Sequence, residues 1–379
     1  MGTHHFLERC HEINGMCPHF KGTKMEKFMG TILLIALLLI ACATDRSTNR
    51  APEKVIVQVE SREKSDTLEE RLKALDQSIS ILRSEVADLE SRLRNIQARP
   101  PLTTFKLPQE LYLCEERVPL EDRNVWENLD REFLLALDNE AQVLLWMKRA
   151  RRYFPHIEKR LKEIGLPEDL KYLAITESSL RPSAISPTGA SGIWQFIPST
   201  GEKYGMRRNR TIDERFDFFK ATEGALAYLK SLYEEFKSWT LAMAAYNAGE
   251  NRVRKEIELQ KTENYFYLDL PMETERYIYK IAVAKIILSD PERFGFRLEV
   301  KGFYDPLQVE RVQIELTQPL PIADIARAIG SYYKEIREMN LHLSEETIPA
   351  GVHFLNLPPG TSDRFWTFFN TWKKGLEYK

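Results

Sequence analysis

The chain has 379 residues, of which 43% are hydrophobic and 29% are charged, and its formal net charge at pH 7 is −2. This length allows two domains plus extensions. The near-neutral charge excludes binding of nucleic acid or of an acidic membrane surface through global charge, so any specificity must come from a local site.

The N-terminal region contains an apolar run that is typical of a signal peptide. Residues 31–40 are almost purely Leu, Ile and Ala and follow a short basic segment. The run is too short to span a bilayer as a helix, but it suits the core of a signal sequence. We therefore interpret residues 25–41 as a signal peptide that starts at Met25. Residues 1–24 are then an over-called start that takes no part in the fold.

The residues after this run indicate lipid anchoring. Leu39-Ile40-Ala41-Cys42 resembles the lipobox of bacterial lipoproteins, which implies cleavage before Cys42 and lipidation of that cysteine. Several acyl chains on one residue would hold the chain stably at a membrane. Ala43 stands where an aspartate favours inner-membrane retention, so the resemblance implies a periplasmic protein anchored to the outer membrane. The alternative is an uncleaved signal anchor with an unpaired Cys42. We expect no disulfide, because Cys114 has no partner after processing.

The next segments predict a tether and a coiled coil. Residues 42–64 are polar and of mixed charge, as in a flexible linker. Within residues 65–98, apolar residues recur at alternating spacings of four and three, which predicts a coiled coil and self-association, with a parallel dimer favoured over a trimer. The other interpretation is an amphipathic helix that packs on the downstream domain. The series is Leu68, Leu72, Leu75, Ile79, Leu82, Val86, Leu89, Leu93 and Ile96.

A helical domain is predicted over residues 109–300, after a boundary marked by Pro100, Pro101 and Pro108. Between residues 181 and 199 lies a loop rich in Pro, Gly and Ser, which is a candidate for forming a site. Apolar periodicity predicts the main helices at 126–150, 154–164, 167–180, 221–236, 239–247 and 273–288.

Glu177 is the candidate catalytic residue of this domain. Leu170, Leu173 and Ala174 form an apolar stripe at helical spacing, and Glu177 takes the next position on that stripe. Burial there should raise the pKa of the carboxyl group, which suits a general acid near neutral pH. On this argument alone, a structural ion pair or a glutamate at the edge of the core fits equally well.

Three motifs in this domain carry a resemblance to an enzyme family. Residues 177–200 read ESSLRPSAISPTGASGIWQFIPST, residues 245–249 read AYNAG, and residues 273–278 read ETERYI. In this order they resemble the soluble-lytic-transglycosylase superfamily, and especially the membrane-bound lytic murein transglycosylase D group. The sequence departs from the family at Leu180, where an aromatic residue is common.

The resemblance implies a mainly α, lysozyme-like α+β domain with a groove for the glycan strands of peptidoglycan. Glu177 would act first as acid and then as base. It would cleave the bond between N-acetylmuramic acid (MurNAc) and N-acetylglucosamine (GlcNAc) with formation of 1,6-anhydro-MurNAc, and it would need no cofactor and no metal. The implied substrate-binding residues, for which packing is the alternative role of the aromatic members, are Ser178, Ser191, Trp194, Gln195, Phe196, Tyr246, Asn247 and Tyr277.

Tyr277 also stands out without the resemblance. It shares a helical stripe with Ile281, Ala284 and Leu288, so it should face inward. A buried hydroxyl group needs a partner, and Glu177 is the natural one, although a backbone carbonyl group could also serve.

The C-terminal region has a different pattern. Strands are predicted at 312–316 and 352–357, and helices at 322–329 and 332–340. This β-α-α-β order over residues 308–360 resembles a LysM carbohydrate-binding module, although Gln318-Pro319-Leu320-Pro321 replaces the usual opening of that module. Residues 361–379 predict a tail with a short aromatic helix.

Two other functions remain open from the sequence. A hydrolytic muramidase on the same fold would use a second acid, and no Asp or Glu within the three motifs has an obvious second role. Asp213 and Glu223 are the nearest candidates, but each is better explained as a surface or helix-terminal charge. A non-catalytic cell-wall-binding scaffold would instead work through the coiled coil and the LysM-like module.

Overall fold

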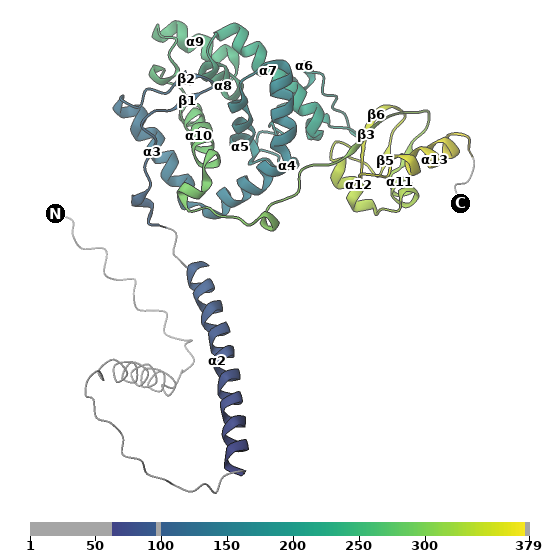
Figure 1. Cartoon of the computed structure of the whole chain (residues 1–379). Coiled ribbons are helices and arrows are strands. Elements are labelled where there is room, and N and C mark those ends of the chain that lie inside the picture. Colours follow the sequence, from purple (N-terminus) through teal and green to yellow (C-terminus); the bar gives the residue numbers. More distant parts are fainter. Residues whose placement is uncertain (1–62, 96–99, 376–379) are drawn as a thin grey trace, which may run out of the picture. The chain divides into compact units, whose positions relative to one another are not determined.

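Helices make up most of the fold, which confirms the predicted mainly helical class. The structure, a computed structural model, describes residues 63–95 and 100–375 (Figure 1). The chain divides into two units, residues 1–93 and 94–379. The predicted signal peptide, Cys42 and most of the tether lie outside the described residues. No helix in the described ranges combines the length and the apolar character that crossing a bilayer requires.

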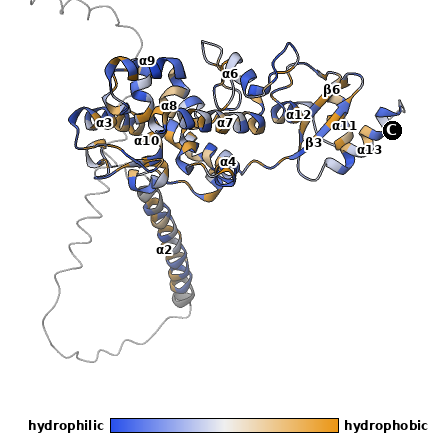
Figure 2. Ribbon diagram, turned by 90° about the horizontal axis from the view of Figure 1, so that it is seen from above, coloured by the Kyte–Doolittle hydropathy of each residue, from blue (hydrophilic) through white to orange (hydrophobic). Residues whose placement is uncertain are grey.

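The first unit contains almost all of helix α2 (Glu63–Asn95), which covers most of the segment predicted as a coiled coil. Hydrophobic and hydrophilic residues alternate along this helix (Figure 2). The side chains of the predicted seam are exposed wherever they are described, with Leu68 at 62% and Leu75 at 61%. Leu93 and Ile96 lie outside the described side chains.

The helical domain in the second unit begins with a short hairpin of strands β1 (Tyr112–Leu113) and β2 (Glu116–Arg117). Six 3-10 turns connect the helices in the described residues: η1 (Leu102–Thr104), η2 (Glu168–Tyr172), η3 (Glu214–Phe216), η4 (Tyr265–Tyr267), η5 (Pro291–Phe294) and η6 (Val300–Gly302). The helices are α3 (Arg123–Asp138), α4 (Glu140–Ile164), α5 (Leu173–Ser178), α6 (Pro198–Lys203), α7 (Phe218–Phe236), α8 (Trp239–Ala248), α9 (Glu250–Gln260) and α10 (Met272–Ser289).

Helix α10 lies at the centre of this domain and packs against α3, α5 and α8. Its buried residues lie all round the helix rather than on one stripe, as expected for a helix enclosed by others. Side-chain caps define where the surrounding helices begin. Asp217 accepts hydrogen bonds from the amides of Phe219 and Lys220 at the start of α7, and Ser238 caps α8 in the same way.

Three predicted helix boundaries differ from the structure. The helix expected over 126–150 ends at Asp138, because Asn139 starts α4 by accepting a hydrogen bond from the amide of Gln142. Helix α4 then continues past Pro155 and includes the next predicted helix. The helix expected over 167–180 is the 3-10 turn η2 followed by α5, and it ends where Ser179 and Leu180 adopt left-handed backbone angles. Helix α9 was not predicted, because its sequence is almost entirely polar.

The C-terminal residues contain the β-α-α-β order predicted from the sequence. Strands β3 (Glu310–Leu316) and β6 (Gly351–Leu357) are antiparallel, with Val312 opposite Leu355. A smaller antiparallel pair joins β4 (Leu320–Pro321) to β5 (Thr347–Ile348). The helices α11 (Ile322–Ile329) and α12 (Tyr333–Met339) lie between the strands in sequence.

The tail forms α13 (Ser362–Lys373), which buries Phe365, Phe368 and Phe369 and packs against α11. These residues belong to a hydrophobic core that is separate from the core of the helical domain. Residues 308–373 therefore have their own apolar interior, and we refer to them as the C-terminal module.

Candidate active site

The three sequence motifs meet at one cavity of about 440 Å³. Its wall is formed by the end of α5, the loop over residues 186–200, α7, the junction of α8 and α9, and the first half of α10. Most of the substrate-binding residues implied by the resemblance line it together with Glu177: Gln195, Phe196, Tyr246, Asn247 and Tyr277.

Glu177 lies in the last turn of α5 and is partly buried in the cavity wall. Burial raises the pKa of its carboxyl group to about 8, and the negative charge of Glu273 contributes in the same direction. The hydrogen bond from Tyr277 and the charge of Lys280 oppose this rise. The pKa leaves a large protonated fraction at neutral pH, which a general acid needs.

Tyr277 is the hydrogen-bond partner of Glu177, as its place on the helical stripe predicted. Its hydroxyl group donates to Glu177 Oε1. Tyr277 is 3% exposed, and burial together with the nearby Glu177 raises its own pKa, so it stays protonated and able to donate. The tyrosine therefore fixes one carboxyl oxygen of Glu177 and leaves Oε2 free of any hydrogen bond in the described part of the chain.

Gln195 lines the cavity from a tight loop. Its backbone is left-handed, with φ 49°. Its Nε2 donates to the carbonyl oxygens of Gly192 at 2.7 Å and Ala184 at 3.3 Å. Ser191 and Phe196 close the loop with paired backbone hydrogen bonds of 3.0 and 3.1 Å. These contacts hold the amide side chain in place and leave its carbonyl oxygen available to a ligand.

Gly192 allows this loop to rest directly on another segment of backbone. Its φ is +81°, and a β-carbon at this position would lie 2.0 Å from the carbonyl oxygen of Arg215. The loop therefore contacts residue 215 with no side chain between the two backbones.

Tyr246 and Asn247 line the cavity but make no hydrogen bond to Glu177 in the described structure. The hydroxyl group of Tyr246 donates to the carbonyl oxygen of Trp194 at 2.8 Å, and Asn247 Oδ1 accepts from Thr274 Oγ1 at 2.9 Å. The charge of Glu177 still raises the pKa of Tyr246, after the larger effect of burial. Tyr246 thus links α8 to the loop over residues 186–200, and Asn247 links α8 to α10.

Three implied substrate-binding residues do not line the cavity. Ser178 is buried and donates to the carbonyl oxygen of Ile193 at 2.8 Å. Ser191 is buried, and its hydroxyl group donates to the carbonyl oxygen of Gly189 at 3.2 Å. Trp194 is fully buried, and its indole nitrogen donates to Thr222 Oγ1 at 3.0 Å. Ser178 therefore links α5 to the loop and Trp194 links the loop to α7, whereas Ser191 bonds within the loop itself.

Several cavity residues were missed by the sequence reasoning. Glu273 and Lys280 flank Tyr277 at helical spacing, and Glu250 begins α9. The spacing of Glu273 and Lys280 could have revealed them, because residues i, i+4 and i+7 share one face of a helix. Thr176 also lines the cavity, and its buried hydroxyl group has no hydrogen-bond partner in the described structure.

The second-acid candidates from the sequence lie elsewhere. Asp213 is paired with Arg215, and Glu223 with Arg160 at 2.6 Å on the surface of the domain. Neither lines the cavity. Besides Glu177, the carboxylates that line the cavity are Glu250 and Glu273, and Glu273 lies inside the third motif. Within the described residues, no group of three or more His, Cys, Asp or Glu is arranged to hold a metal ion.

Comparison with known proteins finds a family match that includes most of the residues lining the cavity. Residues 155–268 match the family model "Transglycosylase SLT domain". Over 222 residues the chain is 33% identical to membrane-bound lytic murein transglycosylase D of Escherichia coli strain K12, covering 57% of this chain and 48% of that protein. It is 31% identical over 148 residues to membrane-bound lytic murein transglycosylase C of Actinobacillus succinogenes, covering 35% of this chain and 40% of that protein.

Among solved structures, the 70 kDa soluble lytic transglycosylase SLT70 of Escherichia coli matches with a TM-score of 0.31 and 20% identity, covering 46% of this chain and 32% of that chain. The chain thus spans about half or less of the length of each of these relatives. The matched family segment includes Glu177, Gln195, Tyr246 and Asn247, whereas Tyr277 follows it.

Proposed function

We propose that this protein is a peptidoglycan lytic transglycosylase that cleaves the MurNAc-β-1,4-GlcNAc bond and forms a 1,6-anhydro-MurNAc product. One observation carries the proposal. A glutamate with a pKa raised to about 8 lines a polar cavity, is held by a buried tyrosine, and lies in the segment that matches the SLT domain.

Glu177 would take part in both proton transfers of the reaction. In the first, the protonated carboxyl group donates its proton to the glycosidic oxygen, so the bond from that oxygen to C1 of MurNAc breaks and GlcNAc leaves as an alcohol. In the second, the carboxylate removes the proton of the C6 hydroxyl group while O6 bonds to C1. The ring closes without consuming water, and Glu177 ends protonated, ready for the next cycle.

The hydrogen bond from Tyr277 suits this alternation. It occupies one oxygen of Glu177, so the proton to be transferred resides on Oε2, which is free of hydrogen bonds in the described residues. It also stabilises the carboxylate that exists between the two transfers. Gln195, Tyr246 and Asn247 would contact the sugars from the cavity wall. The hydroxyl group of Thr176, which has no hydrogen-bond partner among the described residues, would do the same.

A hydrolytic muramidase is the second candidate, and Glu273 is the observation that favours it. A carboxylate in the same cavity as the acid could activate a water molecule, which would then attack C1 in place of O6. The products differ: hydrolysis gives reducing MurNAc ends, whereas transglycosylation gives anhydro ends.

Mass spectrometry of muropeptides released from purified sacculi tests both candidates. The proposal expects anhydro products from the wild-type protein and none from Glu177→Gln. Glu223→Gln, which changes a surface carboxylate outside the cavity, is the matched control and should retain activity. Reducing ends would establish the muramidase. Binding to sacculi without any turnover would instead support the non-catalytic scaffold.

We also propose that the C-terminal module is LysM-like and binds peptidoglycan. The β-α-α-β order supports this assignment. The buried Asn340 supports it too: its Nδ2 donates to the carbonyl oxygen of Asn356, and its Oδ1 accepts from the amide of Asn356. Lipidation of Cys42, outer-membrane attachment in the periplasm and self-association through residues 68–96 remain proposals from the sequence. The exposed apolar seam of α2 supports the last of these.

A further inference from the structure

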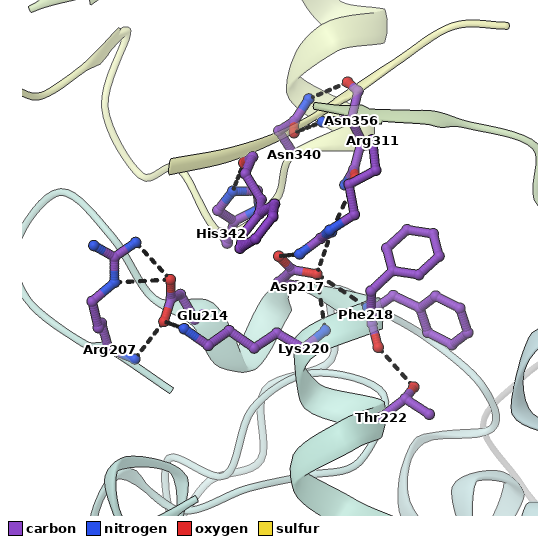
Figure 3. A network of polar contacts seen from close by, with 12 residues as sticks. Arg207, Glu214, Asp217, Phe218, Lys220, Thr222, Arg311, Asn340, His342 and Asn356 are labelled. Carbon is purple, nitrogen blue, oxygen red and sulfur yellow. Dashed lines mark hydrogen bonds and ion pairs between the residues drawn. The ribbon is translucent and has the colours of Figure 1, made fainter. Parts of the chain in front are cut away.

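A buried ionic cluster connects the C-terminal module to the loop that carries Gln195. Its centre is the segment over residues 207–217, which contacts the loop on one side and the module on the other. Figure 3 shows the part of this cluster that faces the module.

On the loop side, Arg215 is the main contact. It is 4% exposed, and it forms a two-pronged ion pair with Asp213, at 2.9 Å from Nε to Oδ1 and 2.6 Å from Nη2 to Oδ2. Its Nη1 donates to the carbonyl oxygens of Gly189 and Phe196, both at 2.8 Å. These two carbonyl groups lie at the two ends of residues 189–196. One guanidinium group therefore fastens both ends of the loop, while Gly192 rests on the backbone of Arg215 itself.

On the module side, the same segment is paired with the backbone between α12 and β5. The amide of Asp213 donates to the carbonyl oxygen of His342 at 2.8 Å, and the amide of Ser344 donates to that of Thr211 at 2.9 Å. Ile212 and Leu343 form the antiparallel bridge between them. His342 is buried, and its Nε2 bonds the carbonyl oxygen of Phe354 on β6, which joins this contact to the core strand pair of the module.

The module is also held to the helical domain by an ion pair between Arg311 and the buried Asp217, which lies two residues after Arg215. Arg311 on β3 donates to both carboxylate oxygens of Asp217, at 3.0 and 2.7 Å. Its guanidinium group also lies 4.9 Å from the ring centre of Phe219 and 4.7 Å from that of Phe354. Asp217 begins α7, and α7 carries Thr222, which accepts the hydrogen bond from Trp194 in the loop. The module is thus connected to the loop by two separate routes.

We infer that docking of the C-terminal module holds residues 189–196 in position, with Arg215 as the positioning residue that transmits the contact. The inference rests on the proposed function only in assigning these residues to an active site. It gives the module a second role besides any binding of glycan. Without the docked module, the segment over 207–217 would lose the backbone partners that align Arg215 with the loop.

The test uses the full chain, with Arg311→Ala to weaken docking and Arg215→Lys to weaken the contact to the loop. Arg327→Ala is the matched control, because Arg327 is an exposed arginine of the same module, paired only with Asp324 in the described structure. Hydrogen exchange followed by mass spectrometry measures protection of the Gly192 and Phe196 amides, which donate to backbone carbonyl groups. This measurement does not depend on catalysis.

We expect exchange at 189–196 to become about tenfold faster or more in both variants and to stay unchanged in the control. On soluble glycan strands, kcat should fall by about tenfold or more with a smaller change in KM, as for a misplaced active-site group. If Arg311→Ala lacks a cooperative thermal transition, Arg311→Lys provides the same comparison with the charge kept. Unchanged exchange at Gly192 and Phe196 in both variants would overturn the inference, whereas a wild-type protein without activity would count against the proposed function alone.

Discussion

Replacing Glu177 with glutamine should stabilise the fold increasingly as pH rises. The folded-state pKa is about 8, against an ordinary value of 4.5, so between these values the folded state binds more protons than the unfolded state. Stability must then fall as pH rises through this window. The glutamine variant has no proton to lose, so it escapes that fall.

The size of the effect follows from the pKa. At pH 7 the unfolded glutamate is ionised and the folded one is mostly protonated, which at about 1.4 kcal/mol per pKa unit gives a loss of about 3 kcal/mol relative to pH 4. The free energy of unfolding of Glu177→Gln, minus that of the wild type, should therefore increase by about 3 kcal/mol between pH 4 and pH 7.

Urea denaturation followed by circular dichroism at a series of pH values measures this difference. Other titrating groups are common to both proteins and cancel in the subtraction. Glu223→Gln is the control, since it alters a carboxylate that the cavity does not enclose. A difference between Glu177→Gln and wild type that stays constant from pH 4 to pH 8 would show that Glu177 is not held in a pKa-raising environment.

Three further predictions concern catalysis, docking and assembly. Tyr277→Phe removes a hydrogen bond that lowers the pKa of Glu177, so the alkaline limb of the pH–rate profile should move upward and kcat should fall about tenfold; an unmoved limb would contradict the contact. Arg311→Ala should cost about 3 kcal/mol of unfolding free energy, measured by urea denaturation, because it leaves Asp217 buried without its cation; a loss under about 1 kcal/mol would mean that the pair is solvated. Leu75→Asp with Leu82→Asp should convert a self-associated chain to a monomer in sedimentation equilibrium, and a wild-type monomer would disprove assembly through α2.

The pH dependence expected of the Asp217 pair has the opposite sign to that of Glu177. Burial disfavours the charge of Asp217, but the hydrogen bonds from Arg311 and the charge of His342 outweigh it and hold the pKa below the ordinary value. Its contribution to stability is therefore present above the ordinary pKa of aspartate and is lost as pH falls through the lowered one.

Much of the fold was predictable from local sequence, because apolar spacing and capping residues act over a few positions. The stripe that ends at Glu177 and the stripe that carries Tyr277 each predicted an inward side chain, and the structure brings these two together. The alternating residues 312–316 likewise predicted β3, and the second strand expected at 352–357 is β6. The break between α3 and α4 was missed although its signal is also local, because Asn139 caps α4 by accepting a hydrogen bond from the amide of Gln142.

The orientation of the loop side chains was not predictable. Ser178 and Trp194 turn away from the cavity because buried partners on the loop backbone and on α7 satisfy their polar groups. Arg215 was missed for a related reason. Its partners, Asp213 and the carbonyl groups of the loop, come together only in the folded chain, and an arginine in a polar segment looks like any surface charge.

The close backbone contact at Gly192 offers a way to move the loop without altering any charged side chain, by the substitution Gly192→Ala. Alanine there adds one carbon that would lie 2.0 Å from the carbonyl oxygen of Arg215 and 3.0 Å from its carbonyl carbon, so the two backbone segments would have to move apart by about 1.4 Å or more to restore ordinary van der Waals spacing. The substitution itself adds and removes no ionisable group. One added carbon would thus displace the part of the cavity wall that carries Gln195 without any change to the carboxyl group of Glu177.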